Sequence, residues 1–153
     1  MSTPEQRLAE LGLTVPDVAP PVAAYVPAVR SGSYVFTAGQ LPMRDGALLT
    51  TGKVGHGVTA EEATACAQQC ALNAIAAIKS VAGDLGAVRI VKVVVFVASD
   101  ANFTGQPGVA NGASELFGTA FGERGIHARS AVGVPVLPLD SPVEVEVIAE
   151  ILG

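Results

Sequence analysis

The segment from Thr59 to Gly83 constrains the fold more than any other part of the chain. Thr59 and Glu62 have the spacing of a capping box, which marks the start of a helix. Beyond it, small and apolar residues recur at helical spacing: Ala63, Cys66, Ala67, Cys70, Ala71, Ala74, Ile75, Ile78 and Val81. Lys79 and Gly83 suit the C-terminal end of such a helix. The pattern predicts a helix at about 60–82, and its many alanines predict close packing on a sheet.

The run at 89–98 (RIVKVVVFVA) is the clearest strand. It is apolar at nearly every position, which is typical of a central strand that is covered on both faces. A second helix is expected at about 109–122. Two further strands are expected at about 129–136 and 143–151, joined as a hairpin around Leu137 and Pro138.

The N-terminal third is expected to hold a short helix or an arm at 1–12 and a strand at 34–39. The Asp-Gly turn at 45–46 predicts a hairpin that returns through residues 47–49. The main elements then follow the order strand, strand, helix, strand, helix, strand, strand. This order predicts an α+β fold, with a mixed sheet and two helices on one of its faces.

Composition indicates a single domain over residues 1–153 that has apolar surface to spare. Half of the residues are hydrophobic, mean hydropathy is +0.47 and only 15% are charged. Such a chain buries a full core and leaves apolar surface exposed, which predicts an obligate homo-oligomer. It has no apolar run of about 18 residues, so no membrane span is expected. The first residues lack the features of a signal peptide, so the expected location is the cytoplasm.

Charge and metal-ligand patterns exclude some classes of partner. The net charge is −5 and the nine basic residues are scattered, which argues against nucleic acid as a ligand. Cys66 and Cys70 stand four residues apart and lack Cys-x-x-Cys spacing. They are expected to be buried thiols. His56 and His127 are isolated in the sequence, so no metal site is predicted, although a zinc site that joins both histidines stays an alternative.

Arg129 and Glu144 form the most informative charged pair. If strands 129–136 and 143–151 form a hairpin, Glu144 lies opposite about Ala131 and shares a face with Arg129. A guanidinium binds a carboxylate through two parallel hydrogen bonds, and a nearby carboxyl group can activate water. The same two residues could instead form a structural ion pair, and their spacing alone favours that interpretation.

Several segments resemble the RidA (YjgF) family. These segments are 24–26 (AYV), 36–42 (FTAGQLP), 91–93 (VKV), 110–112 (ANG), 128–130 (ARS), 137–138 (LP) and 143–146 (VEVE). The likeness runs from about residue 18 to the end. The chain is most similar to a longer branch of the family that has an N-terminal extension, here residues 1–20. The resemblance implies a chorismate-mutase-like fold with a six-stranded mixed sheet. It also implies a homotrimer whose sheets pack around a central barrel.

The resemblance further implies hydrolysis of reactive 2-enamine and 2-imino acids to 2-keto acids and ammonia, in clefts between subunits. No metal or organic cofactor is then required. Arg129 matches the arginine that holds the substrate carboxylate, and Glu144 matches the glutamate that acts through the attacking water. The matching substrate-binding positions are Tyr25, Gly39, Asn111 and Ala131.

Two positions depart from the family pattern. Ala131 replaces a cysteine of the pocket, and Ala38 replaces a small hydroxylated residue before Gly39. Both changes remove polar contacts and leave a second hypothesis open, a non-catalytic trimer that binds small carboxylates. A ribonuclease or translation inhibitor is a third hypothesis, which the acidic net charge disfavours.

Overall fold

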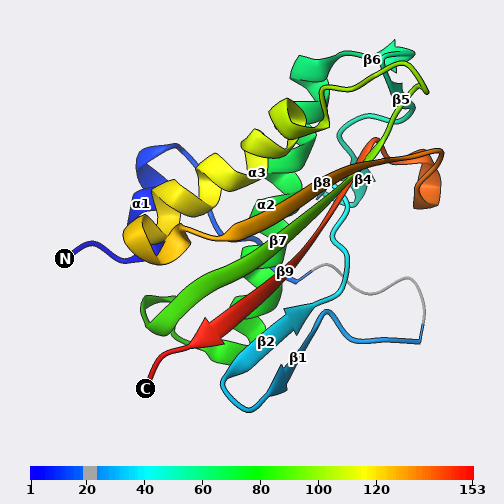
Figure 1. Ribbon diagram of the computed structural model, residues 1–153. Coiled ribbons are helices and arrows are strands. Elements are labelled where there is room, and N and C mark those ends of the chain that lie inside the picture. The colour runs from blue at the N-terminus through cyan, green and yellow to red at the C-terminus, as the bar shows by residue number, and fades with distance from the viewer. Residues whose placement is uncertain (19–23) are drawn as a thin grey trace.

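The computed structural model describes residues 1–18 and 24–153, and it places three helices on one face of a mixed sheet (Figure 1). The sheet has five strands in the spatial order β1-β2-β9-β7-β8. The strands are β1 (Ala28–Ser31), β2 (Tyr34–Thr37), β7 (Val88–Ala98), β8 (Ala128–Val134) and β9 (Val143–Ile151). The helices are α1 (Pro4–Glu10), α2 (Ala60–Ala82) and α3 (Gln106–Phe121). The α+β class and the chain order of the main elements are confirmed.

The predicted count of six strands is wrong, because two short ribbons stay apart from the five-stranded sheet. β3 (Met43–Arg44) pairs only with β4 (Ala47–Leu48), through the expected Asp-Gly turn at 45–46. The strand expected at 34–39 therefore does not return through this turn. β5 (Lys53–Val54) pairs with β6 (Gly57–Val58). Single turns of 3-10 helix follow at η1 (Leu85–Ala87), η2 (Gly122–Gly125) and η3 (Pro138–Asp140).

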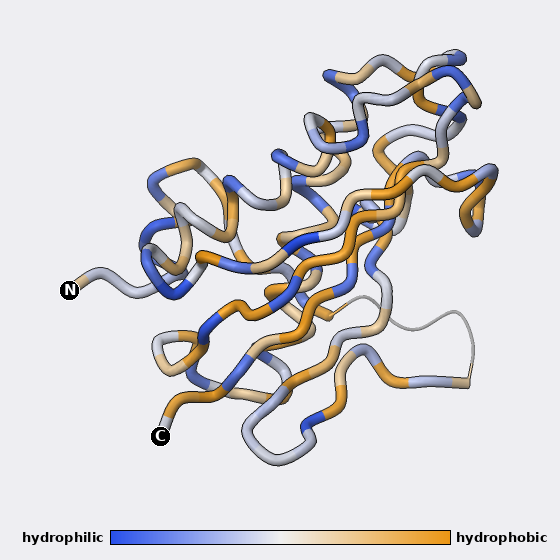
Figure 2. The backbone as a smooth tube through the Cα atoms, viewed as in Figure 1, coloured by the Kyte–Doolittle hydropathy of each residue, from blue (hydrophilic) through white to orange (hydrophobic). Residues whose placement is uncertain are grey.

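Strand β7 lies in the interior of the sheet, between β8 and β9. It runs parallel to β8 and antiparallel to β9, and Val93, Val95 and Val97 on its helix-facing side are fully buried. Because β7 separates β8 from β9, the hairpin predicted around Leu137 and Pro138 is wrong. A parallel pair needs a crossover connection, and α3 provides it. Figure 2 shows the hydrophobic residues concentrated along these central strands.

Helix α2 is buried on nearly every side, because it packs against α3 as well as against β9, β2 and β1. The two helices approach closely where Gly112 of α3 faces α2. A Cβ atom at Gly112 would lie 2.2 Å from the carbonyl oxygen of Thr64. The alanine-rich stripe predicted for α2 therefore serves helix–helix packing as well as packing on the sheet.

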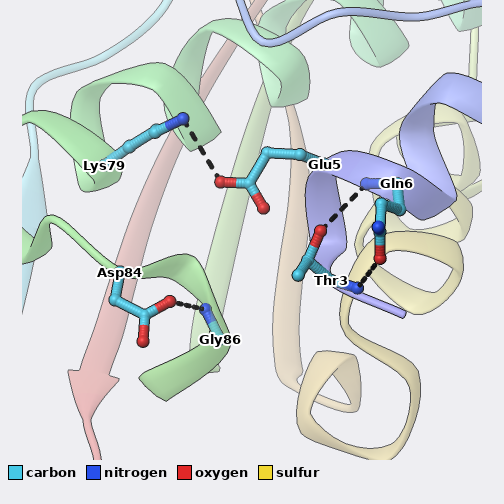
Figure 3. Close-up of polar contacts among 6 residues, drawn as sticks. All are labelled: Thr3, Glu5, Gln6, Lys79, Asp84 and Gly86. Atoms are coloured by element: carbon cyan, nitrogen blue, oxygen red, sulfur yellow. Dashed lines mark hydrogen bonds and ion pairs between the residues drawn. The ribbon is translucent and has the colours of Figure 1, made fainter. Parts of the chain in front are cut away.

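Helix α1 is fixed to the helix layer by its N-terminal cap and by one ion pair. Thr3 and Gln6 form a reciprocal capping box, and Glu5 pairs with Lys79 of α2 at 3.2 Å (Figure 3). Arg7 donates a hydrogen bond to the carbonyl oxygen of Ala120 in α3. The short helix expected at 1–12 is thus confirmed, whereas residues 19 and 20 of the expected extension lie outside the described residues.

The approach of α2 and α3 predicts that Gly112→Ala costs about 1–3 kcal/mol of unfolding free energy, because a methyl group overfills the contact with Thr64. Gly118→Ala is the matched control on the same helix, since a Cβ there meets no atom within 4 Å. It should gain about 0.5–1 kcal/mol from helix propensity. Urea unfolding of both variants measures the difference, and equal effects would contradict the packing argument.

Candidate functional site

Arg129 and Glu144 lie on opposite faces of the sheet. Arg129 is in register with Val93 and Val147, which are buried under the helices. Glu144 is in register with Phe96, whose side chain points to the face that carries no helix. The expectation that both residues share one face is therefore wrong, and so is the structural ion pair between them. The reason is the register across β7: Glu144 aligns through Phe96 with Val132 and not with Ala131, so it shares a face with Val132 and not with Arg129.

The Arg129 side chain packs against α3 and is held by neutral acceptors. Its Nη1 donates to Asn111 Oδ1 at 2.8 Å and to Ser114 Oγ at 3.2 Å. Its Nη2 donates to the carbonyl oxygen of Pro107 at 3.3 Å. No acidic side chain among the described residues pairs with this guanidinium. Its positive charge therefore stays available for an anionic ligand.

The hydrogen bonds of Arg129 do not use all the donors of its guanidinium group. Of its five N–H donors, Nε and the second hydrogen of Nη2 donate to none of the described residues. Nε and Nη2 are the two nitrogens along one edge of the planar group. This is the geometry that receives the two oxygens of a carboxylate.

Ser114 and His127 extend the support of Arg129, and sequence reasoning missed this role for both. His127 Nδ1 lies 2.6 Å from the carbonyl oxygen of Gly125, and Nε2 lies 2.9 Å from Ser114 Oγ. Because a carbonyl can only accept, Nδ1 carries the proton and Nε2 accepts from the serine hydroxyl. The hydroxyl oxygen of Ser114 is then turned toward Arg129. Phe117 holds the imidazole in a T-shaped contact, with ring centroids 5.9 Å apart.

Glu144 lies against Gly39, a contact that only glycine permits. A Cβ atom at residue 39 would lie 2.0 Å from Glu144 Oε1. Gln40, the next residue, exchanges two main-chain hydrogen bonds with Val145. The bridge fixes the position of Gly39 beside β9. The need for glycine at this position thus comes from the carboxyl group of Glu144.

The carboxyl group of Glu144 is half-buried and its pKa is raised. Burial against apolar neighbours raises the pKa of Glu144 above its ordinary value, and the negative charge of Glu146 raises it further. Among the described residues, no hydrogen-bond donor reaches the carboxyl oxygens of Glu144. A carboxyl group in this state can donate a proton as well as accept one.

Two groups of predicted site residues result, and they define two half-sites. The Arg129 half-site contains Arg129, Asn111 and the supporting Ser114. The Glu144 half-site contains Glu144, Gly39 and Tyr25, since Tyr25 and Gly39 line one cavity. Ala131 lies on the same face of β8 as Arg129 and packs against the core.

The cysteines form no further site in the described part of the chain. Cys66 and Cys70 are buried free thiols, as expected, and burial raises the pKa of Cys66 to about 11. Within residues 1–18 and 24–153, no three His, Cys, Asp or Glu side chains gather to hold a metal ion. No helix in the described part of the chain has the length and apolarity to cross a membrane.

Comparison with known proteins places this geometry in a wider group. A family profile described as "YjgF/chorismate_mutase-like, putative endoribonuclease" matches residues 5–151. Protein TCP17 of Trypanosoma cruzi is 44% identical over 147 residues, which cover 95% of this chain and 92% of that protein.

Solved structures give the same grouping. The crystal structure of a "putative endoribonuclease" from Shewanella oneidensis is 36% identical, with a TM-score of 0.95 over 98% of this chain and 100% of that one. The structure of E. coli TdcF with bound serine is 27% identical, with a TM-score of 0.62 over 89% of this chain and 93% of that one. These matches confirm the chorismate-mutase-like fold.

The raised pKa of Glu144 predicts a pH-dependent stability difference. A carboxyl group whose pKa is higher in the folded state stabilises the protein fully below its unfolded pKa, and this contribution is lost as pH rises through the folded pKa. Glu144→Gln cannot titrate. We expect its unfolding free energy to rise relative to wild type as pH increases from about 4 to about 8.

Urea unfolding at one protein concentration and several pH values measures this difference. Glu61→Gln, an exposed substitution in the first turn of α2, controls for the loss of one negative charge. A Glu144→Gln difference that falls with rising pH would refute the desolvation of Glu144.

Proposed function

Since this chain belongs to the YjgF family, we propose that it hydrolyses small 2-imino acids, or their 2-enamine tautomers, to 2-keto acids and ammonia. The proposal places the reaction in the cytoplasm, where the free thiols Cys66 and Cys70 stay reduced. The main support is that Arg129 and Glu144 each lack an oppositely charged partner among the described residues. Arg129 offers two N–H donors that no described residue uses and has no acidic partner, and Glu144 offers a partly desolvated carboxyl group with a raised pKa.

The two groups match the needs of imine hydrolysis. The carboxylate of the substrate binds Nε and Nη2 of Arg129, which orients the adjacent imine carbon. Protonated Glu144 donates to the imine nitrogen while a water oxygen attacks the carbon, and the C=N π electrons move to nitrogen. The resulting Glu144 carboxylate takes a proton from the added water, which leaves a neutral carbinolamine. Glu144 then gives this proton to the amine nitrogen, and the C–N bond breaks with its electron pair going to the leaving ammonia. The hydroxyl oxygen forms the carbonyl and returns its proton to Glu144.

The proposed site is shared between two copies of the chain, in a homotrimer. Within one copy, the Arg129 and Glu144 half-sites lie on opposite faces of the sheet, so a single copy does not bring them together. The helix-free face also exposes apolar side chains. Val29, Phe36 and Val132 are 53%, 43% and 43% exposed, which is surface that an assembly would bury.

A non-catalytic carboxylate binder is the second candidate. The bound serine of TdcF, a molecule with a carboxylate, supports binding of such ligands in a relative. Ala38 and Ala131 lack polar groups that would assist chemistry. The unpaired and desolvated carboxyl group of Glu144 favours hydrolysis over simple binding, because it serves no purpose in a binder. The endoribonuclease description of relatives finds no support in a chain of net charge −5.

Turnover of 2-iminopropionate, generated in place by an amino-acid oxidase, tests the proposal. Arg129→Ala should lower kcat/KM about 100-fold or more, mainly through KM, because the carboxylate loses a bidentate partner. Glu144→Gln should lower kcat by about 10²–10⁴-fold with little change in KM. Arg30→Ala, which removes an exposed arginine, is the control. Wild-type rates no higher than the enzyme-free rate would sink the deaminase proposal.

Mixed assemblies test whether the site is shared between copies. Arg129→Ala and Glu144→Gln are each expected to be inactive alone. When the two variants are co-assembled at random, about a quarter of the interfaces should combine an intact Arg129 with an intact Glu144. Activity should therefore return to about a quarter of the wild-type value. No recovery, in mixed oligomers verified by mass spectrometry, would place both residues in a site within one copy or in none.

A further inference from the structure

A cavity of about 510 Å³ lies where residues 16–18, the β3–β4 hairpin and α2 meet. This volume is in the range of small-molecule sites, about 300–1,000 Å³. Its walls are largely apolar and include Val18, Leu41 and Met43. Its charged residues, Arg44 and Asp45 among them, are exposed to solvent. The cavity therefore suits an apolar group that enters from a polar rim.

The cavity adjoins the Glu144 half-site. Tyr25 and Gly39 line it, and the carboxyl group of Glu144 lies against the same Gly39. A molecule that places its reacting carbon beside Glu144 thus has the cavity next to it. The imino acids with the smallest side chains would leave this space unused.

Gln69 of α2 adds one polar group to the cavity, and its orientation can be deduced. Asn73 Nδ2 donates to the carbonyl oxygens of Leu41 and Met43, at 3.0 and 2.9 Å. Asn73 Oδ1 must then face Gln69, whose Nε2 donates to it at 3.1 Å. Since Nε2 donates to Asn73, Oε1 is the polar atom of the Gln69 side chain that remains. It accepts no hydrogen bond from the described residues, although Gln69 is only 8% exposed.

No buried side-chain nitrogen or oxygen atom of the described residues lacks a partner, so this unpaired oxygen is open to solvent, and a ligand in the cavity can take the place of water as its donor. Gln69 lines the cavity, so a ligand there can reach it. An apolar wall with one acceptor selects an apolar group that carries an O–H or N–H donor. The cavity would thus select the substrate by its side chain, whereas the two half-sites recognise its carboxylate and its imine.

We infer that this cavity is a side-chain subsite for large, mainly apolar 2-imino acids, with Gln69 Oε1 accepting a hydrogen bond from a donor on that side chain. The inference rests on the proposed function for the placement of the reacting carbon. It assigns specificity to Met43 and Gln69, neither of which touches the reacting atoms. An aromatic side chain with a hydroxyl group fits both the apolar wall and the acceptor.

Binding of stable 2-keto acids, the products of the proposed reaction, tests the subsite without requiring turnover. Calorimetry on the wild-type protein should give a Kd for phenylpyruvate about tenfold or more below that for pyruvate. Met43→Trp fills part of the cavity and should remove this preference, with pyruvate binding unchanged within about twofold. Leu11→Trp is the control for added bulk, since Leu11 is exposed and lies outside the cavity.

The role of Gln69 is tested by comparing two ligands that differ by one hydroxyl group. Wild-type protein should bind 4-hydroxyphenylpyruvate more tightly than phenylpyruvate, and Gln69→Leu should abolish that difference. Gln69→Glu, which keeps an acceptor oxygen, should retain it. Circular dichroism and thermal unfolding verify that each variant is folded.

The outcomes separate this inference from the proposed function. Equal affinity of wild type for pyruvate and phenylpyruvate, or a preference that survives Met43→Trp, would overturn the subsite. If 2-iminopropionate is hydrolysed in that case, the deaminase proposal stands alone. Size-selective binding without turnover of any imine would support the subsite and overturn the deaminase.

Discussion

The position of β7 between β8 and β9 is the constraint on which the rest of the structure depends. β7 is apolar on both faces, so it belongs in the interior of the sheet, with strand partners on both edges. Its pairing with β8 is parallel, which forces α3 to cross over the sheet between them. The same arrangement puts Arg129 under α3 and Glu144 on the helix-free face. The two groups therefore cannot neutralise each other within one copy.

This separation gives each group an unusual environment that the fold has to support. Arg129 is surrounded by neutral oxygen acceptors, which hold its orientation without cancelling its charge. Ser114 and His127 add a chain of hydrogen bonds that ends at the carbonyl of Gly125. The cost of burying Glu144 is lowered because its raised pKa favours the uncharged form. Both groups stay reactive because neither has an oppositely charged partner among the described residues.

The sequence predicts the elements of this fold better than their pairing, for a physical reason. The ends of α2 follow from local signals, namely the Thr59 cap and Gly83, and the buried stripe follows from spacing along one helix. Pairing of strands is not local. Leu137 and Pro138 resemble a hairpin turn, but they connect two strands that both pair with β7. The shared face predicted for Arg129 and Glu144 was derived from a direct pairing of β8 with β9. Because that pairing is wrong, the shared face is wrong as well.

The resemblance of short segments identified Arg129, Glu144, Gly39 and Asn111 as a group, and the structure brings them together in two pairs. Ser114 and His127 stand 13 residues apart on different elements, a spacing that carries no signal by itself. Gln69 falls within the buried stretch of α2, where a polar residue among small ones is the only hint of a role. Such contacts depend on how α2, α3 and the β3–β4 hairpin pack, which no single segment encodes.

In the proposed assembly, Glu144 responds to two opposing influences. Covering the helix-free face removes water from around Glu144, which raises its pKa, while a neighbouring guanidinium lowers it. A substrate carboxylate that pairs with Arg129 cancels much of that positive field. Burial and the negative charge of Glu146 are then the influences that act on Glu144, and both raise its pKa toward the protonated acid that the proposed reaction uses. Under the proposed function, the separation of Arg129 from Glu144 within one copy would therefore couple three events: assembly, carboxylate binding and protonation of the acid.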